Sequence, residues 1–259
     1  SSGPEIGNML KGKVAGLTIR QNSAQPGGGL DILVRGAGSV NASNAPLFVV
    51  DGFPIVDLEQ PESGGRYNAG TQSILNSFNP NDIESMDVLK DASSASIYGL
   101  RAANGVIMVT TKKGKAGRTA INYESYAGIK NILNRVKMAD AGQYITYVNQ
   151  NLAALNSTWQ LADKSSQANN TDWYDEVLKN GSVFNNAINL SGGSESVDYF
   201  LSVNNFKENG ILSGSSFTRN TIRNNNTYKF FNNRLKFNQT LNLTFTEATP
   251  KPYGAFSDA

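Results

Sequence analysis

In the second half of the chain, apolar and polar residues alternate with a period of two. From Leu235 to Phe245 the odd positions are apolar except Gln239, and the even positions between them are polar. This period predicts a β-strand with one apolar face. A strand of about twelve residues exceeds the five or six usual in soluble proteins and matches the nine to eleven that cross a bilayer at a tilt. We therefore predict five lipid-facing residues, Leu235, Phe237, Leu241, Leu243 and Phe245.

Four earlier stretches of this half show the same alternation. They lie at 121–130, 188–191, 198–204 and 217–229, and the last is the weakest, because only three of its apolar residues are in phase. The second and third stretches, and the fourth and fifth, are joined by short connections at Gly192–Ser196 and Lys229–Asn233. Short turns on one side and long loops on the other are typical of outer-membrane barrels.

A long insert separates the first stretch from the second. We expect it at about 132–183, on the extracellular side if the barrel pattern holds. It carries a helix signal at Asp140–Leu155, with Ile145, Val148, Leu152 and Leu155 on one face. A second helix signal follows at 171–181, capped by Thr171 or Asp172 and stopped by Gly181.

Before residue 119 the pattern changes to short apolar runs separated by glycine turns and small helix signals. Ile32–Gly36 and Leu47–Val50 predict buried strands, and the Asp51-Gly52 pair after the second predicts a tight turn. Asp82–Asp91 and Gly105–Gly114 predict two further strands, with a short helix between them that Asp91 can cap. Strands and short helices in this arrangement predict a small α+β domain at 1–118, followed by a second domain at 119–259.

The composition removes several classes of function. The chain of 259 residues has no histidine and no cysteine, which excludes Ser-His-Asp and Cys-His nucleophiles, Cys/His zinc sites and disulfides. Its 23 basic and 21 acidic residues give a net charge of +2, so no basic footprint for nucleic acid is present. A binding or transport protein remains possible, as does an enzyme built on carboxylates, for which Asp87 and Asp91 are weak candidates.

Five blocks of the sequence carry a resemblance to a known family. They are Leu10–Gly28, Ile32–Ile55, Asn79–Lys115, TDWYDEVLKNG at 171–181 and LSGGSESVDYFLSVNNFKENGIL at 190–212. Over essentially the whole chain they resemble the SusC/RagA family of TonB-dependent outer-membrane transporters. The resemblance implies an α+β plug, a small mixed sheet with short helices, followed by the first antiparallel strands of a transmembrane barrel of about 22 strands. Because about five strands alone would leave unpaired edges in hydrocarbon, we expect further polypeptide to complete the barrel.

The resemblance also implies a function and partners. It implies active import of an oligosaccharide or peptide across the outer membrane of a Gram-negative bacterium, without catalysis, cofactor or metal. The partners would be TonB, acting through a segment upstream of Ser1, and a SusD-like surface lipoprotein, with the transporter–lipoprotein pairs forming a dimer. On the residues alone, a secreted α+β glycan-binding or adhesin module with no transport role stays open. That alternative predicts that the apolar face of 235–245 packs on a second sheet.

Charged residues of the plug are candidates for holding it in the barrel. The resemblance suggests that Arg35, Glu84, Asp87 and Lys90 latch the plug to the wall or gate it, although Asp87 stands where the family pattern usually has Glu. Hydrated charge pairs suit a plug that must move, since they hold it in place and can still be broken. The alternative is that these are ordinary solvated charges at strand ends.

Plug loops are candidates for contact with substrate. Aromatic side chains stack on sugar rings or peptide side chains, and Asn and Arg form hydrogen bonds with polar groups. The candidates are Asn41, Ser43 and Asn44, together with Phe53, Arg66, Tyr67 and Asn68 in a predicted loop at 53–77. The alternative is a solvated loop without a ligand. Gly36, Gly52, Gly99 and Gly105 are interpreted as turn glycines, and Gln25–Asp31 lacks the Gly-Lys-Ser/Thr ending of a phosphate cradle.

Overall fold

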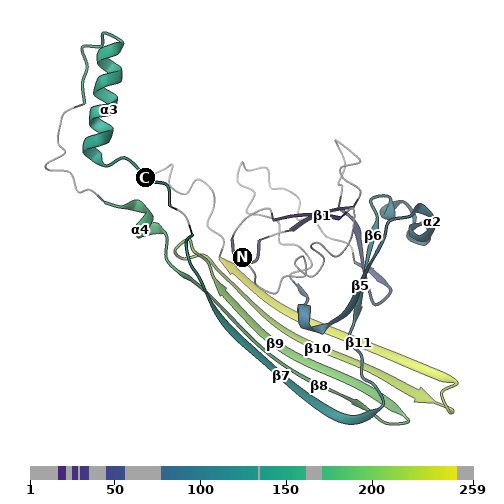
Figure 1. Cartoon of the computed structure of the whole chain (residues 1–259). Coiled ribbons are helices and arrows are strands. Elements are labelled where there is room, and N and C mark those ends of the chain that lie inside the picture. The colour runs from purple at the N-terminus through teal and green to yellow at the C-terminus, as the bar shows by residue number, and fades with distance from the viewer. Residues whose placement is uncertain are drawn as a thin grey trace.

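A long sheet and a shorter sheet that meets it end-on dominate the structure. The computed structural model describes residues 17–21, 25–28, 30–34, 45–55, 77–133, 135–161 and 171–249. The long sheet has five strands, and the strand ends of a four-stranded mixed sheet meet one of its faces (Figure 1). A separate two-stranded sheet pairs β1 (Leu17–Gln21) with β2 (Leu30–Val34) in antiparallel fashion. This arrangement confirms the predicted order of a small α+β unit followed by antiparallel strands.

All five alternating stretches are strands of the long sheet, which we call the wall. The order β11-β10-β9-β8-β7 joins sequence neighbours throughout, and every pair is antiparallel. Even the weakest prediction, at 217–229, is a full strand of 15 residues. The strands are β7 (Gly117–Lys130), β8 (Gly181–Gly193), β9 (Val197–Asn209), β10 (Ser216–Phe230) and β11 (Leu235–Thr249).

The two ends of the wall differ. At the turn end, where β7 begins, short connections join β8 to β9 and β10 to β11. At the insert end, the chain between β7 and β8 contains α3 (Ala141–Ala154) and α4 (Trp173–Val177). At the same end, the connection between β9 and β10, 210–215, is short. This connection is held by the segment after α4, since Leu178 bridges Leu212 and the Lys179 amide donates to the Ile211 carbonyl over 2.8 Å.

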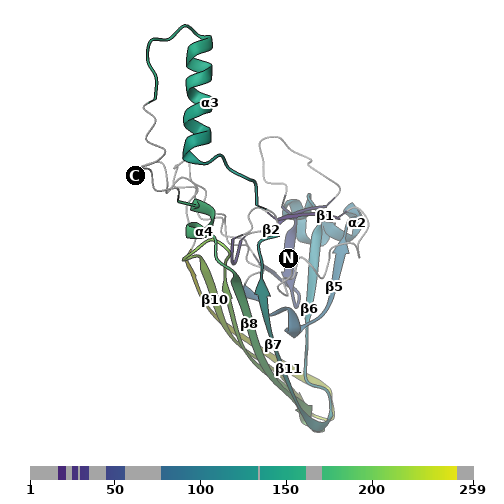
Figure 2. The same ribbon diagram turned by 60° about the vertical axis from the view of Figure 1, so that its left-hand side comes forward.

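Both predicted helices of the insert are present. Asp140 begins α3 with a capping box, in which its carboxylate accepts from the Gln143 amide over 2.7 Å. Asp172 rather than Thr171 caps α4, and α4 ends at Val177 rather than at Gly181, because the chain turns extended there to reach the bridge to 210–215. Helix α3 lies away from both sheets (Figure 2).

The predicted apolar face of α3 is only partly covered. Ile145, Val148 and Leu152 are half-buried, whereas Leu155 is exposed. Among the described helices, none is long and apolar enough to cross a membrane.

The four-stranded sheet, which we call the plug sheet, has the order β4-β3-β6-β5. Its central strands β3 and β6 run parallel, and the outer pairs are antiparallel. Short helical segments connect β5 to β6 and precede β5. The elements are β3 (Leu47–Val50), β4 (Phe53–Ile55), η2 (Pro80–Asp82), β5 (Ile83–Leu89), α2 (Ala92–Ala95), η3 (Ser96–Ala102) and β6 (Val106–Thr111).

The plug sheet has an apolar cluster on each face. Val49 and Val106 pack with α2 and η3 on one face, while Val50, Ile107 and Val109 pack on the other with residues of β1 and β2. Burial on both faces explains why β3 and β6 are continuous apolar runs without alternation. Asp91 occupies the N-cap of α2 as predicted, but its side chain makes no cap hydrogen bond there. Its carbonyl instead accepts from the Ala95 amide over 3.0 Å.

Candidate functional site between the plug sheet and the wall

Polar residues of β10 face the plug sheet. Arg219, Thr221, Arg223 and Asn225 are buried, and they alternate with residues on the opposite face of the strand. The period-two geometry of the strand puts all four on one side. The contact between the two sheets is therefore made largely by charged and hydrogen-bonding groups.

An ion pair lies at the centre of this contact. Arg223 Nη2 donates to Asp51 Oδ2 over 2.7 Å, and the two side chains are only 2% and 8% exposed. Asp51 also accepts from the Thr111 amide over 2.9 Å and from the Thr111 hydroxyl over 2.6 Å. One carboxylate of the plug sheet thus joins the ends of β3 and β6 to the middle of the wall.

The tight turn after β3 explains how Asp51 reaches this position. Its backbone has φ of 51°, in the left-handed region that Asp adopts more readily than most residues with a Cβ. Since β3 and β6 are parallel neighbours, the turn directs the carboxylate to the end of β6, where Thr111 lies. Leaving either charge of such a buried pair without its partner costs about 3–5 kcal/mol.

Further hydrogen bonds extend the contact across the wall. Arg219 Nη1 donates to the Phe78 carbonyl over 3.0 Å, and its guanidinium lies 5.2 Å from the ring centre of Phe206. Asn225 Nδ2 donates to the Lys112 carbonyl over 2.8 Å. At one edge of the wall, Thr244 Oγ1 of β11 donates to the Ser77 carbonyl over 2.8 Å. At the other edge, Glu124 Oε2 of β7 accepts from Asn81 Nδ2 over 3.1 Å. Strands β7, β10 and β11 therefore each contribute a side-chain hydrogen bond to the chain before residue 117.

A second carboxylate lies buried beside the ion pair. Asp82 ends the η2 turn, is 4% exposed, and its carbonyl accepts from the Lys112 amide over 2.8 Å. Burial raises the pKa of the Asp82 carboxyl above its ordinary value, against the opposing charges of Arg223, Lys112 and Arg219. The charged form of Asp82 is thus held at an energetic disadvantage within the interface.

The interface also buries polar atoms that are not satisfied by the described residues. Thr221 Oγ1, Arg223 Nε and Asn225 Oδ1 have no hydrogen-bond partner among them. Each such atom costs about 1–3 kcal/mol when shielded from water. The interface therefore differs from an apolar core, because it buries charged and hydrogen-bonding groups.

Comparisons with known proteins agree with this geometry. The family model described as TonB-dependent Receptor Plug Domain matches residues 2–106. The TonB-dependent receptor SusC of Bacteroides thetaiotaomicron is 38% identical over 232 residues, which are 89% of this chain and 22% of that protein. The TonB-dependent receptor P26 of Formosa agariphila is 34% identical over 85% of this chain and 21% of its own length.

A solved structure extends the agreement to both sheets. A structure of the RagAB peptide transporter superposes with a TM-score of 0.80 at 27% identity, over 96% of this chain and 30% of that chain. The chain belongs to the SusC/RagA family of TonB-dependent receptors. Members of this family are outer-membrane β-barrel proteins of Gram-negative bacteria, and they are transporters rather than enzymes. The chain spans about a fifth of the length of the curated relatives it matches.

A glycine-containing loop gives the receptor's plug a further contact with the wall. Gly27 has φ of 67°, and a Cβ at this position would lie 2.3 Å from the ring of Phe217 on β10. Phe217 is 2% exposed and packs with Phe206 and Val183. Gly27 belongs to the stretch Gln25–Asp31, which was considered above as a phosphate cradle. It packs closely against the wall, and both its positive φ and the nearby Phe217 ring require a residue without a Cβ.

The plug residues that we expected to form the latch follow one edge strand of the plug sheet. Glu84 and Asp87 lie on β5, and Lys90 follows its end. Glu84 forms an exposed ion pair of 3.5 Å with Lys115, in the linker to the wall, rather than with a wall residue. Exposed pairs of this kind contribute about 0–1 kcal/mol. Arg35 lies outside the described residues. The strong contacts with the wall come instead from the turn after β3.

The expected substrate-facing residues are placed only in part. Phe53 lies in the short strand β4, paired with β3, and not in a loop as predicted; its side chain is 73% exposed. The turn brings Phe53 into register with Val50, which explains the extra strand. Gly52, Gly99 and Gly105 all have positive φ. Outside the described residues lie Gly36, Asn41, Ser43, Asn44, Arg66, Tyr67 and Asn68.

The residues expected to face lipid lie on the outer face of β11. Thr244 contacts the plug, so its neighbours on the strand point away from it. Their exposed fractions run from 42% for Leu241 to 66% for Phe245. Leu243 pairs with Ile222, which lies on the same outer face of β10. The full set of five is exposed: Leu235, Phe237, Leu241, Leu243 and Phe245.

Sequence reasoning missed the residues at the centre of the site. In the sequence, Asp51 indicates only a turn, and Thr111 only a strand. Arg219, Arg223 and Asn225 lie in the strand with the weakest apolar alternation. No periodic signal distinguishes them, because Asn220 and Asn224, at positions between them, are polar as well.

Proposed function

We propose that this chain forms the plug and the first wall strands of a TonB-dependent importer for an oligosaccharide or a peptide. In this proposal residues 1–118 are the plug and residues 119–259 begin the barrel. The insert end faces the outside of the cell, and the turn end faces the periplasm. The observation that supports the proposal most is the buried Asp51–Arg223 pair, which joins the two sheets through side chains alone.

The interface suits a plug that is displaced by force. TonB, acting on a segment upstream of Ser1, pulls part of the plug away from the wall. The Asp51–Arg223 pair exchanges its partner for water when the sheets separate, whereas an apolar seal would lose its burial with no such compensation. Arg35, Glu84, Asp87 and Lys90 act with this pair as weaker, hydrated contacts that set the plug's resting position.

Substrate is proposed to bind on the outer side of the plug. Exposed Phe53 offers an aromatic surface for a sugar ring or a peptide side chain. The polar candidates Asn41, Ser43, Asn44, Arg66, Tyr67 and Asn68 supply hydrogen bonds around it. A SusD-like surface lipoprotein covers the bound substrate, and two transporter–lipoprotein pairs form a dimer. The likeness to the RagAB peptide transporter supports a peptide as cargo, and an oligosaccharide is the alternative cargo.

The outer face of the wall is proposed to contact lipid. The apolar residues of β11 and their cross-strand neighbours form the outward surface, opposite to the plug. No observation favours a secreted glycan-binding or adhesin module, since that alternative needs a second sheet packed on this face. The described residues place no such sheet there.

A reversible lock between plug and wall tests the proposal. This chain contains no cysteine, and in a full-length receptor from which any other cysteine is removed, Asn81→Cys and Glu124→Cys introduce a unique pair at a contact of 3.1 Å. The full-length receptor carrying both changes is bridged with a short bifunctional thiosulfonate in cells that lack the native gene. We expect uptake of labelled oligosaccharides or peptides to stop when the bridge is formed and to return on reduction.

The control carries Asn81→Cys alone and is treated in the same way. If the bridged receptor imports cargo as fast as the reduced one, the plug need not leave the wall and the proposal is wrong.

A further inference from the structure

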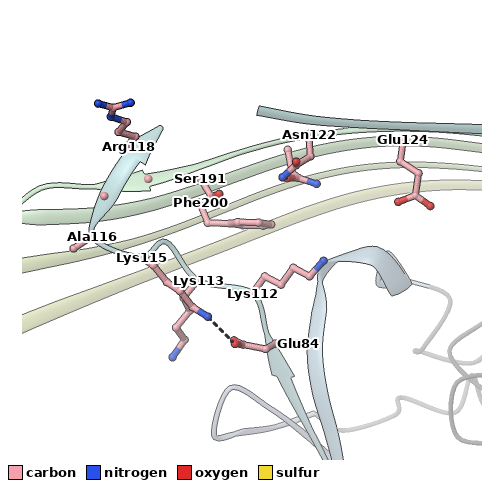
Figure 3. Close-up of a pocket in the computed structure, with 13 residues that line it drawn as sticks. Glu84, Lys112, Lys113, Lys115, Ala116, Arg118, Asn122, Glu124, Ser191 and Phe200 are labelled. Atoms are coloured by element: carbon pink, nitrogen blue, oxygen red, sulfur yellow. Dashed lines mark hydrogen bonds and ion pairs between the residues drawn. The ribbon is translucent and has the colours of Figure 1, made fainter. Parts of the chain in front are cut away.

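A polar cavity lies between the linker that leaves the plug and the inner face of the wall. Its volume is about 610 Å³, within the range of small-ligand sites. Figure 3 shows that the linker after β6 forms one side, while β7, β8 and β9 supply the other. The cavity is at the turn end of the wall, where β7 begins. None of its lining residues is among the substrate-facing candidates proposed above.

Positive charge dominates this cavity. Four cationic side chains, Lys112, Lys113, Lys115 and Arg118, line it against two carboxylates, Glu84 and Glu124. Both carboxylates are engaged, Glu84 with Lys115 and Glu124 with the Asn81 amide. Among the described residues, neither Lys112 nor Lys113 forms an ion pair. The cavity thus carries a net positive charge beside neutral hydrogen-bonding groups, although the buried Asp82 carboxyl interacts with the charge of Lys112.

The wall side of the cavity is built for polar, extended molecules. Asn122 Nδ2 donates to Asn189 Oδ1 over 3.1 Å, and this amide pair leaves further donor and acceptor positions open to the cavity. The ring of Phe200, only 2% exposed, forms part of the floor. Amides and a hydroxyl hold sugar or peptide units by hydrogen bonds, and the buried Phe200 ring supports the floor beneath them.

Hydrogen bonds of the plug–wall interface hold the plug side of the cavity in place. The Lys112 amide donates to the Asp82 carbonyl, and the Lys112 carbonyl accepts from Asn225 of the wall, each over 2.8 Å. The backbone that carries Lys112 and Lys113 is therefore tied both to the plug and to β10. Movement of the plug would move these lysines, so binding in the cavity is coupled to the position of the plug.

We propose that this cavity is a transit site for carboxylate-bearing cargo on the periplasmic side of the plug. The inference rests on the proposed import function and narrows its substrate to acidic oligomers, either acidic oligosaccharides or acidic peptides. A carboxylate approaching from the wall side meets Lys112 and Lys113, while the rest of the oligomer lies along the Asn122–Asn189 pair. Charge attraction in a confined polar site also raises the local concentration of such a molecule.

Equilibrium binding to the purified full-length receptor in detergent tests this proposal. The acidic probes are trigalacturonate and tri-glutamate with blocked termini, and the neutral counterparts are maltotriose and blocked tri-glutamine. We expect one acidic probe to bind at least tenfold more tightly than its neutral counterpart, and the probe that does so identifies the source of the carboxylate. Lys112→Gln/Lys113→Gln should weaken that binding at least tenfold.

Two further variants separate the site from general charge effects. Glu84→Gln removes a competing carboxylate and should strengthen binding of the acidic probe severalfold, an effect that misfolding cannot produce. Lys137→Gln/Lys207→Gln removes the same charge from exposed positions outside the cavity and should leave binding unchanged. If neither acidic probe exceeds its neutral counterpart, or if this control weakens binding equally, the transit site is refuted.

The outcome is distinguishable from failure of the import proposal. Binding to the purified receptor needs neither TonB nor plug movement. If the acidic probe binds as expected but uptake continues while the plug is bridged to the wall, only the import proposal is contradicted. Bridge-sensitive uptake without any preference for acidic probes contradicts the transit site alone.

Discussion

Removal of Arg223 should release the plug sheet from the wall without unfolding either one. In Arg223→Ala, the Asp51 carboxylate keeps its two hydrogen bonds from Thr111 but loses the ionic partner that it has among the described residues. Its side chain, 8% exposed in the intact pair, stays largely within the interface while the plug sheet and the wall remain together. The free energy of separation should therefore fall.

The expected size follows from this burial. Breaking a buried pair by removing one partner costs about 3–5 kcal/mol. At about 1.4 kcal/mol per tenfold change, this corresponds to a hundredfold to a few thousandfold rise in the population of the separated state. A double variant, Asp51→Asn/Arg223→Gln, leaves no buried charge unpaired and should recover most of the loss.

Thiol labelling of the full-length receptor measures this population. Thr221→Cys, in a receptor without other cysteines, places a thiol on the plug-facing side of β10, at a position that is 1% exposed in the intact interface. In this background Arg223→Ala should speed labelling at least a hundredfold, while Arg234→Ala, at an exposed arginine in the β10–β11 turn, should not. Labelling of the Arg223→Ala variant within threefold of its parent, or a double variant as labile as the single ones combined, would refute the reasoning.

Two further predictions concern the same interface. Gly27→Ala should loosen the plug by about 1–3 kcal/mol, because the new Cβ would lie 2.3 Å from Phe217 as well as at positive φ. Gly52→Ala, which has positive φ but nothing within 4 Å, should cost less, and limited proteolysis of the plug compares the two; equal susceptibility would contradict the packing argument. Asp82→Asn should stabilise the receptor at neutral pH, because burial raises the pKa of this carboxyl and so disfavours its charged form. A raised carboxyl pKa means that the folded state binds protons more readily, so the wild type gains stability as pH falls through that pKa, and the advantage of the variant should shrink toward pH 4. Thermal unfolding between pH 7 and pH 4 checks this sign, and a variant less stable than the wild type at pH 7 contradicts it.

Much of the fold could be predicted because its determinants are local. Side chains of a strand alternate between two faces, so a wall with an apolar outer face and a polar inner face shows its period directly in residues such as Leu241 and Asn242. The buried strands β3 and β6 appear as continuous apolar runs for the related reason that both of their faces are covered. Caps such as Asp140 act within one turn of their helix and are equally readable.

The candidate site was less accessible because its partners are distant in sequence. Arg223 and Asp51 are 172 positions apart, and nothing near either residue indicates that the other will lie 2.7 Å away. The family resemblance suggests a latch at other charged residues, among them Glu84 and Asp87 of β5. In the structure, Glu84 pairs with the linker instead, because β5 is the edge strand and its side chains reach the chain that passes beside it.

By itself, the sequence determined the order of elements: a small mixed sheet with short helices, then five long strands with an interrupting helical insert. It could do so because hydrogen bonding and side-chain direction within a strand or helix depend on neighbouring residues. Only the tertiary structure decided which polar side chains meet between the two sheets, why Gly27 must lack a side chain, and where cationic residues enclose a cavity. These depend on surfaces that come together only when the plug sheet packs on the wall, and such contacts leave no period in the sequence.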